Sequence, residues 1–318
     1  MSKAIYQYKL LYPKLLWNRP VHFYKAQAGK VLVLAGSKGM TGAAILTSEA
    51  VFRSGTGIML LGFPESLKEI YKEILPEAMT LALPETPSAS LSKKSEPEII
   101  SHSKSCDVSV IGPGLSQNAE TTQLLWQLVF ELRIPIVLDA DGLYAITKGI
   151  EVIRKKEGVD FLTNYFQKRK NPLVLTPHQQ EAANLLNSIR TNEFPKNVSS
   201  KFIDEHKLEV AHFLSVALDT IVVIKGHDTV ICEKDKNVID KIGGPELATA
   251  GSGDVLSGII GSFIGQNPKN IFEAVCTAVY LHSLSGKIAR DKFTERSVIA
   301  SDIIRFLPEA IKRTEDEL

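Results

Sequence analysis

The residues that most clearly could do chemistry lie in the run Gly243 to Ile264, GGPELATAGSGDVLSGIIGSFI. Small residues at 250–253 precede Asp254, and from Val255 onward apolar residues recur at helical spacing. Asp254 therefore lies at or next to a helix N-terminus, where unpaired N–H groups and the helix dipole favour an anion. An acidic side chain there can cap the helix, or it can take a proton from a nucleophile that is being phosphorylated. Both interpretations stay open for this run alone.

Polar or glycine-rich turns also follow four short apolar runs that are typical of buried parallel strands, such as KVLVLA at 30–35. These turns are Gly36 to Gly42, Gly112 to Gly114, Asp139 to Gly142 and Thr176 to Glu181. In a right-handed parallel sheet such turns gather at one edge. Singly each is more simply a turn. Together they predict a cleft of backbone N–H groups, carboxylates and one histidine.

Each polar residue of this cleft also has a structural interpretation. His178 alone would more often be a surface or core histidine. Asp139 and Asp141 could cap the next helix, although carboxylates at i and i+2 also suit hydrated Mg²⁺. Lys225 ends an apolar run and could extend its ammonium to solvent or contact a phosphate. The glycines of the first turn match neither the dinucleotide nor the P-loop pattern.

The alternation of apolar runs with helical patterns predicts an α/β fold, a single-domain three-layer α/β/α sandwich with a mostly parallel central sheet. No linker divides the chain, so we expect one domain over 1–318 with a core of about 22–310. Further strands are expected at 57–63, 220–225 and 230–234, and helices at 271–289 and 297–311. Residues 84–106 contain an expected loop-like stretch, and 147–171 are expected to form a charged surface excursion.

The composition excludes several classes of function. The 318 residues are 44% hydrophobic and 23% charged, with a formal net charge of +1, so nucleic acid and acidic membranes are not expected partners. Cys106, Cys232 and Cys276 are too widely spaced for a disulfide framework or a zinc site. No apolar run reaches the length of a membrane span, and the N-terminus lacks the pattern of a secretory signal. We expect a cytoplasmic protein.

Six segments in order make the chain resemble a known family: AGSKGMTGAA, IGPGL, VLDADGL, VLTPHQQE, VIKGHDT and GPELATAGSGDVLSG. The chain is similar, from about residue 22 to 310, to the ADP- or ATP-dependent NAD(P)H-hydrate dehydratases of the ribokinase-like superfamily. The resemblance implies a repair lyase that phosphorylates the C6 hydroxyl of the S form of hydrated NADH or NADPH. Elimination of phosphate then restores the nicotinamide ring. Many such proteins also carry an epimerase domain, which we do not expect here because only some 25 residues precede the first strand.

The resemblance assigns roles residue by residue. It makes Asp254 the catalytic base on the C6 hydroxyl and requires Mg²⁺ with ADP or ATP as phosphoryl donor. The remaining roles are hydrated-dinucleotide binding by Ala43, Gly114, His178 and Asp254; adenine-nucleotide binding by Lys225, Gly226, His227, Asp228, Thr229 and Gly253; a phosphoryl cradle of Ala250, Gly251, Ser252 and Gly253; and support for Mg²⁺ by Asp141 and Glu181.

The chain departs from the family pattern at two places. Gln179-Gln180 follows the histidine where many relatives have Pro-Gly, and Gly244 to Ala248 replaces Asn-Pro-x-Met-Ala. We expect these changes to affect the entry of one helix and the geometry of one loop. ADP is favoured over ATP, the choice between hydrated NADH and NADPH stays open, and a homotetramer working with a separate epimerase is expected.

Two other functions would fit the same fold. One is a ribokinase-like kinase for a hydroxymethylpyrimidine, a thiazole or a sugar, which would release a stable phosphorylated product. The other is a non-catalytic adenine-nucleotide sensor, which would bind nucleotide without turnover.

Overall fold

The computed structural model describes residues 5–6, 19–157 and 160–317. Its ten strands form one sheet in the order β1-β10-β9-β8-β7-β6-β5-β2-β3-β4. The strands are β1 (Ile5–Tyr6), β2 (Lys30–Leu34), β3 (Ile58–Pro64), β4 (Met79–Leu83), β5 (Val108–Ile111), β6 (Ile136–Leu138), β7 (Leu173–Leu175), β8 (Ile221–Ile224), β9 (Thr229–Glu233) and β10 (Lys236–Asp240). All neighbouring strands are parallel except β9, which is antiparallel to both β8 and β10.

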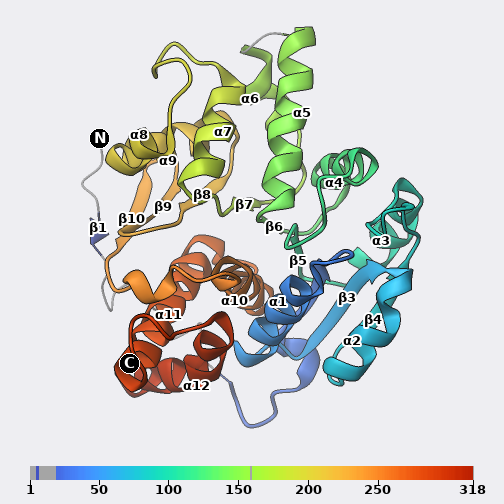
Figure 1. Ribbon diagram of the computed structural model, residues 1–318, viewed down its shortest axis with the longest axis vertical. Coiled ribbons are helices and arrows are strands. Elements are labelled where there is room, and N and C mark those ends of the chain that lie inside the picture. The colour runs from blue at the N-terminus through green and yellow to red at the C-terminus, as the bar shows by residue number, and fades with distance from the viewer. Residues whose placement is uncertain (1–4, 7–18, 158–159, 318) are drawn as a thin grey trace.

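Helices cover both faces of this sheet (Figure 1). They are α1 (Thr41–Arg53), α2 (Lys68–Ile74), α3 (Glu96–Ser103), α4 (Ala119–Glu131), α5 (Asp141–Glu157), α6 (Asp160–Phe166), α7 (Gln179–Ile189), α8 (Ser200–Glu205), α9 (Lys207–Ala217), α10 (Ser252–Gln266), α11 (Ile271–Lys292) and α12 (Ala300–Glu317). Short 3₁₀ turns lie at Lys25–Ala28, Glu65–Leu67, Lys93–Ser95 and Pro245–Leu247. The expected three-layer fold is confirmed.

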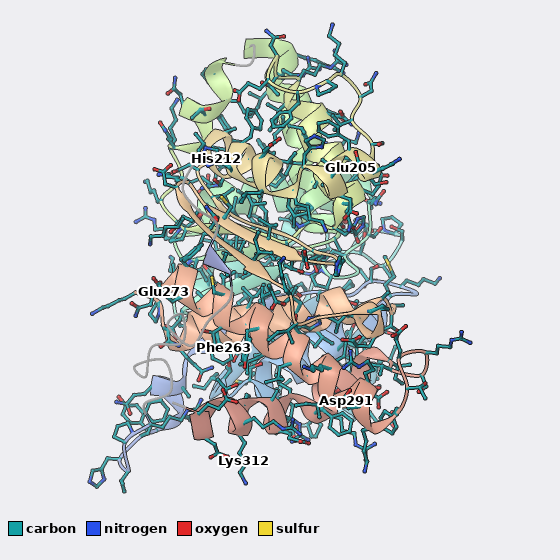
Figure 2. The ribbon with its side chains drawn as sticks, turned by 90° about the vertical axis from the view of Figure 1, so that its left-hand side faces the viewer. Glu205, His212, Phe263, Glu273, Asp291 and Lys312 are labelled. Carbon is teal, nitrogen blue, oxygen red and sulfur yellow. The ribbon has the colours of Figure 1, made fainter. Side chains whose placement is uncertain are left out.

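Alternation within the strands explains the two helical layers. Val31 and Val33 point into a core shared with α1, α2, α10, α11 and α12, whereas Leu32 and Leu34 point into a core shared with α3 to α9. Because side chains alternate along a strand, a continuous apolar run buries both faces at once. Figure 2 shows Phe263 of α10 inside the first layer and Lys312 of α12 directed away from the protein.

Two sequence expectations were wrong, whereas the loop-like stretch expected within 84–106 is present. It ends before α3, Glu96–Ser103, which has Pro97 in its first turn, where a missing N–H costs nothing. The excursion at 147–171 is largely helical: α5 continues to Glu157, with Ile146, Ile150 and Ile153 buried at helical spacing, and α6 follows.

The second error concerns strands that were not expected. β4 and β10 extend the sheet on either side, and β1 pairs with β10 inside what was expected to be a polar lead-in. Most of that lead-in lies outside the described residues. β4 and β10 each carry a polar or exposed residue among their apolar ones, which weakens the pattern of a buried strand.

The strand order fixes where a ligand can bind. The chain moves outward from β2 to β3 and β4, and then returns to place β5 on the other side of β2. The carboxyl ends of β2 and β5 therefore flank a topological switch point, where open α/β sheets bind ligands. The turns after these two strands meet there, since the Gly36 N–H donates to the Pro113 carbonyl at 2.8 Å.

The contact between α1 and α10 offers a test of this packing. A Cβ on Gly258 of α10 would collide with the Thr47 carbonyl of α1 and lie 2.9 Å from the Ala50 Cβ. Alanine normally stabilises a helix interior relative to glycine by about 1 kcal/mol, but overpacking costs about 1–3 kcal/mol. We expect Gly258→Ala to lower the free energy of unfolding in urea by about 1–2 kcal/mol. Gly42→Ala in α1, where no atom lies within 4 Å, is the control and should not destabilise. Equal stability of Gly258→Ala and the wild type would contradict this packing.

Candidate active site

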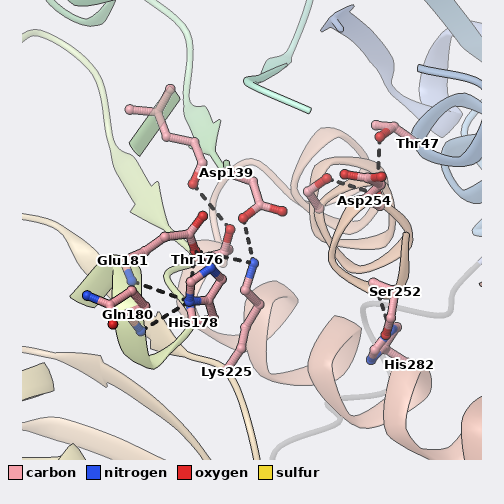
Figure 3. Close-up of polar contacts among 12 residues, drawn as sticks. Thr47, Asp139, Thr176, His178, Gln180, Glu181, Lys225, Ser252, Asp254 and His282 are labelled. Carbon is pink, nitrogen blue, oxygen red and sulfur yellow. Dashed lines mark hydrogen bonds and ion pairs between the residues drawn. The ribbon is translucent and has the colours of Figure 1, made fainter. Parts of the chain in front are cut away.

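The residues that end β6 and β8 form a buried ion pair. Lys225 Nζ lies 2.6 Å from Asp139 Oδ1 and 3.9 Å from Glu181 Oε2 (Figure 3). Asp139 is only 2% exposed. Burial acts to lower the pKa of Lys225, but the charges of Asp139 and Glu181 outweigh it and hold that pKa above its usual value. Lys225 is therefore a fixed cation, and its side chain does not extend to solvent.

The first turn of α10 packs directly against this ion pair. A Cβ on Gly253 would lie 3.2 Å from Lys225 Nζ and 3.4 Å from Asp139 Oδ2, so a larger residue there would press on the ion pair. Gly251 precedes the helix with φ of 87°, a backbone conformation that glycine adopts readily. The N–H groups of Gly253 and Asp254 donate no hydrogen bond within the described residues. They are the free donors that a helix N-terminus offers to an anion.

Asp254 does not cap its helix. No hydrogen bond among the described residues involves its carboxylate, and the bonds from the Thr47 and Ser257 hydroxyls go to its backbone carbonyl. Burial raises the pKa of Asp254 to about 6, and the charge of Asp139 adds to this, while Lys225 opposes it. A carboxylate with a pKa near the working pH is a stronger proton acceptor than an ordinary one. The structure thus favours the chemical interpretation of this residue over the capping one.

His178 has a defined hydrogen-bonding state. Its Nδ1 accepts from the N–H groups of Gln180 at 3.1 Å and Glu181 at 3.3 Å, and Glu181 Oε2 accepts from the His178 N–H at 2.8 Å. This reciprocal capping box starts α7 without the Pro-Gly of many relatives. Burial lowers the pKa of His178, and Lys225 adds to the effect. The ring is therefore neutral near pH 7, with its proton on Nε2.

Ala43 and Gly114, which were expected to bind the hydrated dinucleotide, lie side by side at the topological switch point. A Cβ on Gly114 would come within 3.0 Å of the Ala43 Cβ and 2.9 Å of the Met40 carbonyl. Next to them the Ser116 N–H donates to Asp141 Oδ2 at 2.7 Å. A continuous edge thus runs from α1 through the turn after β5 to the start of α5.

A cavity of about 670 Å³ opens beside Lys225. It is lined on one side by the turn after β8 and the start of α10, with Gly226, His227, Thr229, Ser252 and Gly253, and on the other by residues 243–249. Asp228, Ala250 and Gly251 were expected near a nucleotide but do not line it. Asp228 instead lies 3.7 Å from both His227 and Lys241, as ion-pair partners.

The roles of two residues in the site were not predicted from the sequence. Asp139 was considered only as a cap or a metal ligand, because its partner Lys225 is 86 positions away. His282 of α11 was not considered; its Nε2 lies 3.0 Å from the Ser252 carbonyl and 3.2 Å from its hydroxyl. Burial lowers the pKa of His282 to about 4, so a neutral ring supports the first turn of α10. A single histidine within an apolar helical pattern gave no signal of this role.

The carboxylates suit a cation that is bound mainly through water and phosphate. Asp139, Asp141, Glu181 and Asp254 lie close enough to influence one another, and burial raises the pKa of Asp141 and of Glu181. Among the described residues, no three His, Cys, Asp or Glu side chains are arranged to hold a metal ion. Mg²⁺ usually takes only one or two carboxylates plus substrate phosphates, so this oxygen-rich set fits it. Asp141 and Glu181 already accept backbone hydrogen bonds.

Comparison with known proteins identifies the family. The sequence profile described as NAD(P)H-hydrate dehydratase matches residues 31–309. The chain belongs to the NAD(P)H-hydrate dehydratase family. No helix of the described residues is long and apolar enough to cross a membrane.

Named relatives within the NAD(P)H-hydrate dehydratase family differ in length. A bifunctional NAD(P)H-hydrate repair enzyme of Moorella thermoacetica is 34% identical over 95% of this chain but 52% of its own length. The chain thus spans about half of such bifunctional relatives. The ADP-dependent (S)-NAD(P)H-hydrate dehydratase of Bacillus subtilis is 29% identical over 94% of both chains.

Two solved structures share the fold of this family member. A ribokinase-like superfamily protein of Enterococcus faecalis has a TM-score of 0.75 at 26% identity, covering 97% of this chain and 95% of its own. The ADP/ATP-dependent NAD(P)H-hydrate dehydratase of Bacillus subtilis, co-crystallised with ATP and Mg²⁺, has a TM-score of 0.74 at 25% identity, covering 98% and 99%. The ribokinase-like fold is therefore confirmed.

The buried ion pair leads to a stability prediction. Lys225→Met leaves the Asp139 carboxylate buried without its partner, which costs about 3–5 kcal/mol in comparable pairs. We expect urea unfolding to show a loss of that size, and the double variant Lys225→Met/Asp139→Asn to recover part of it. Lys201→Met, which removes an exposed ammonium 3.9 Å from Glu205, is the control and should change stability little. If Lys225→Met unfolds like this control, the ion pair does not stabilise the site.

Proposed function

We propose that this protein dehydrates the S form of hydrated NADH or NADPH, using ADP or ATP as phosphoryl donor. The observation that carries the proposal is the position of Asp254. Its carboxylate has a pKa raised to about 6 and stands one residue after Gly253, whose N–H and neighbouring Lys225 offer positive charge to a phosphoryl group. The site therefore combines a base that can deprotonate a hydroxyl with N–H groups and an ammonium that can bind the phosphoryl group which that hydroxyl would attack.

The reaction follows from the chemistry of the leaving group. Hydroxide leaves carbon poorly, whereas phosphate leaves well. Asp254 accepts the proton of the C6 hydroxyl. The oxygen of that hydroxyl attacks the terminal phosphorus of the donor, and the bond from this phosphorus to the rest of the donor nucleotide breaks. The phosphorylated carbon then loses phosphate, and loss of a ring proton restores the double bond. The N–H groups of Gly253 and Asp254 hold the transferred group in place.

The two nucleotides take opposite sides of Lys225. The donor fits the cavity lined by Gly226, Thr229 and Gly253, and the hydrated ring fits the edge formed by Ala43 and Gly114. His178 lines the donor cavity, with its Nε2 3.6 Å from Glu181 Oε2, and we assign it to the hydrated dinucleotide from the family resemblance. Mg²⁺, when bound, would shield the donor phosphates from the carboxylates of Asp141 and Glu181. We retain ADP as the favoured donor because relatives named ADP-dependent match this chain over nearly their whole length.

We also propose one catalytic domain over the whole chain, a homotetramer, and pairing with a separate epimerase. The second activity is suggested by relatives named bifunctional that are about twice as long. Phe293 and Ile299, 40% and 55% exposed, offer apolar contacts for assembly next to α12. The three cysteines are free and buried, which supports a reducing compartment such as the cytoplasm.

The direct test is an absorbance assay. Purified protein with hydrated NADH or NADPH, Mg²⁺ and either ADP or ATP should regenerate absorbance at 340 nm and release phosphate in equal amount. A stable phosphorylated product without phosphate release would identify a kinase. Nucleotide binding without any turnover would identify a sensor, and both results would contradict the proposal.

The pKa of Asp254 gives a second prediction. Because the base must be ionised, kcat/KM should fall tenfold per pH unit as the pH drops below about 6, the pKa of that carboxyl. Asp254→Asn keeps the shape but cannot accept the proton, so turnover should fall by about 10²-fold or more.

The control for Asp254→Asn is nucleotide affinity, measured by calorimetry, which should stay within about threefold of the wild type. Lys72→Met, which removes an exposed ammonium of α2 that lines neither cavity, should leave the acidic limb of the pH profile in place. Full turnover in Asp254→Asn would show that another group is the base.

A further inference from the structure

A second cavity of about 640 Å³ lies on the other side of the Lys225 cluster from the donor cavity. It begins at Asp141 and Glu181 and continues between α5 and α7 toward Arg154, Lys155 and Arg190. We call this space the α5–α7 groove. Because Glu181 Oε2 is 3.9 Å from Lys225 Nζ, the groove starts at the reaction site.

The groove is long. Asp141 is the first residue of α5 and Arg154 lies 13 residues farther along the same helix. At a rise of about 1.5 Å per residue, the two positions are roughly 20 Å apart along the helix axis. The Asn187 side chain anchors the far wall by bonding the Val198 N–H at 2.9 Å and the Val198 carbonyl at 3.0 Å. A ligand in this groove would be elongated.

The charges along the groove are arranged by sign. The end at the reaction site carries the carboxylates of Asp141 and Glu181, and the far end carries Arg154, Lys155 and Arg190. Between them Lys148 and Glu151 neutralise each other at 3.0 Å. A phosphate is repelled by the first end and attracted by the second. The groove thus fixes the direction of a ligand that has one uncharged end and one anionic end.

Arg154 has a buried hydrogen-bond donor, its Nε–H, that has no partner among the described residues. Buried donors are normally satisfied, so this N–H is available to an acceptor that enters the groove. Arginine suits a phosphate because its planar guanidinium can donate two parallel hydrogen bonds.

We propose that the α5–α7 groove binds the half of the hydrated dinucleotide that is remote from the reacting ring, with Arg154 and Arg190 contacting phosphate at its adenosine end. This inference rests on the proposed function. In the proposed function the donor nucleotide takes the cavity lined by Lys225, and the groove begins at Glu181 beside the same lysine, which places it next to the donor site. A phosphate on the adenosine ribose, present only in the NADPH form, lies farther from the ring than the diphosphate does. Arg154 therefore favours hydrated NADPH over hydrated NADH.

The test compares the two substrates in Arg154→Met. KM for hydrated NADPH should rise about tenfold or more, as expected for loss of a charge-assisted phosphate contact. KM for hydrated NADH should rise less, and kcat and KM for the donor should change less than twofold. Arg190→Met should act in the same direction. Arg133→Met, an exposed arginine that does not line the groove, is the control and should change no parameter.

Binding of NADP⁺, a stable analogue, is measured by calorimetry with saturating ADP and Mg²⁺ present to fill the donor cavity. Its affinity should fall about tenfold in Arg154→Met and Arg190→Met, and NAD⁺ should bind with lower affinity than NADP⁺ to the wild type. If the wild type binds NADP⁺ in this way but dehydrates neither substrate, the proposed function fails and the groove assignment stands. If dehydration occurs and both arginine variants keep wild-type KM values and NADP⁺ affinity, the groove assignment is overturned.

Discussion

The buried ion pair between Lys225 and Asp139 is the contact on which the arrangement of the site depends. The two residues follow β8 and β6, which flank β7, so their contact at 2.6 Å joins the ends of three neighbouring strands. Taking both charges out of water is costly, and a buried pair is retained only where its geometry is good. Here Glu181 adds a second acceptor at 3.9 Å, and the first turn of α10 covers the pair. The interaction therefore fixes the helix that carries Asp254.

The same cluster would separate the two nucleotides of the proposed function. Lys225 lines the donor cavity, whereas Glu181 lines the α5–α7 groove, and their side chains are in contact. Each cavity thus ends at the same group of charges, where a transferred phosphoryl group would lie. Burial of the Asp254 carboxylate in this cluster also raises its pKa, and the nearby charge of Asp139 raises it further. One packing arrangement accounts for both position and reactivity.

Much of the fold and part of the site could be predicted from the sequence, for a local reason. The strand, turn and helix at 30–53 form a contiguous pattern, as does the helix that follows Asp254. Long-range contacts could not be predicted from residue patterns, since only the sheet order brings Asp139 to Lys225. The missed continuation of α5 over 147–157 shows another limit: its buried isoleucines were present, but dense Lys, Arg and Glu masked them.

Charge balance in the site favours a further cation once the proposed substrates are bound. Four carboxylates, Asp139, Asp141, Glu181 and Asp254, face one lysine, so the site is acidic whenever they are ionised. Burial raises the pKa values of Asp254 and Glu181, and the neighbouring carboxylates raise them further, because protonation relieves both effects. A donor nucleotide would add further negative charge to the same space. Protonation of Asp254 would remove the base, so the balance is better restored by a divalent cation shared with the donor phosphates. The buried, acidic surroundings that raise the pKa of Asp254 are thus the same surroundings that a divalent cation would neutralise in the proposed reaction.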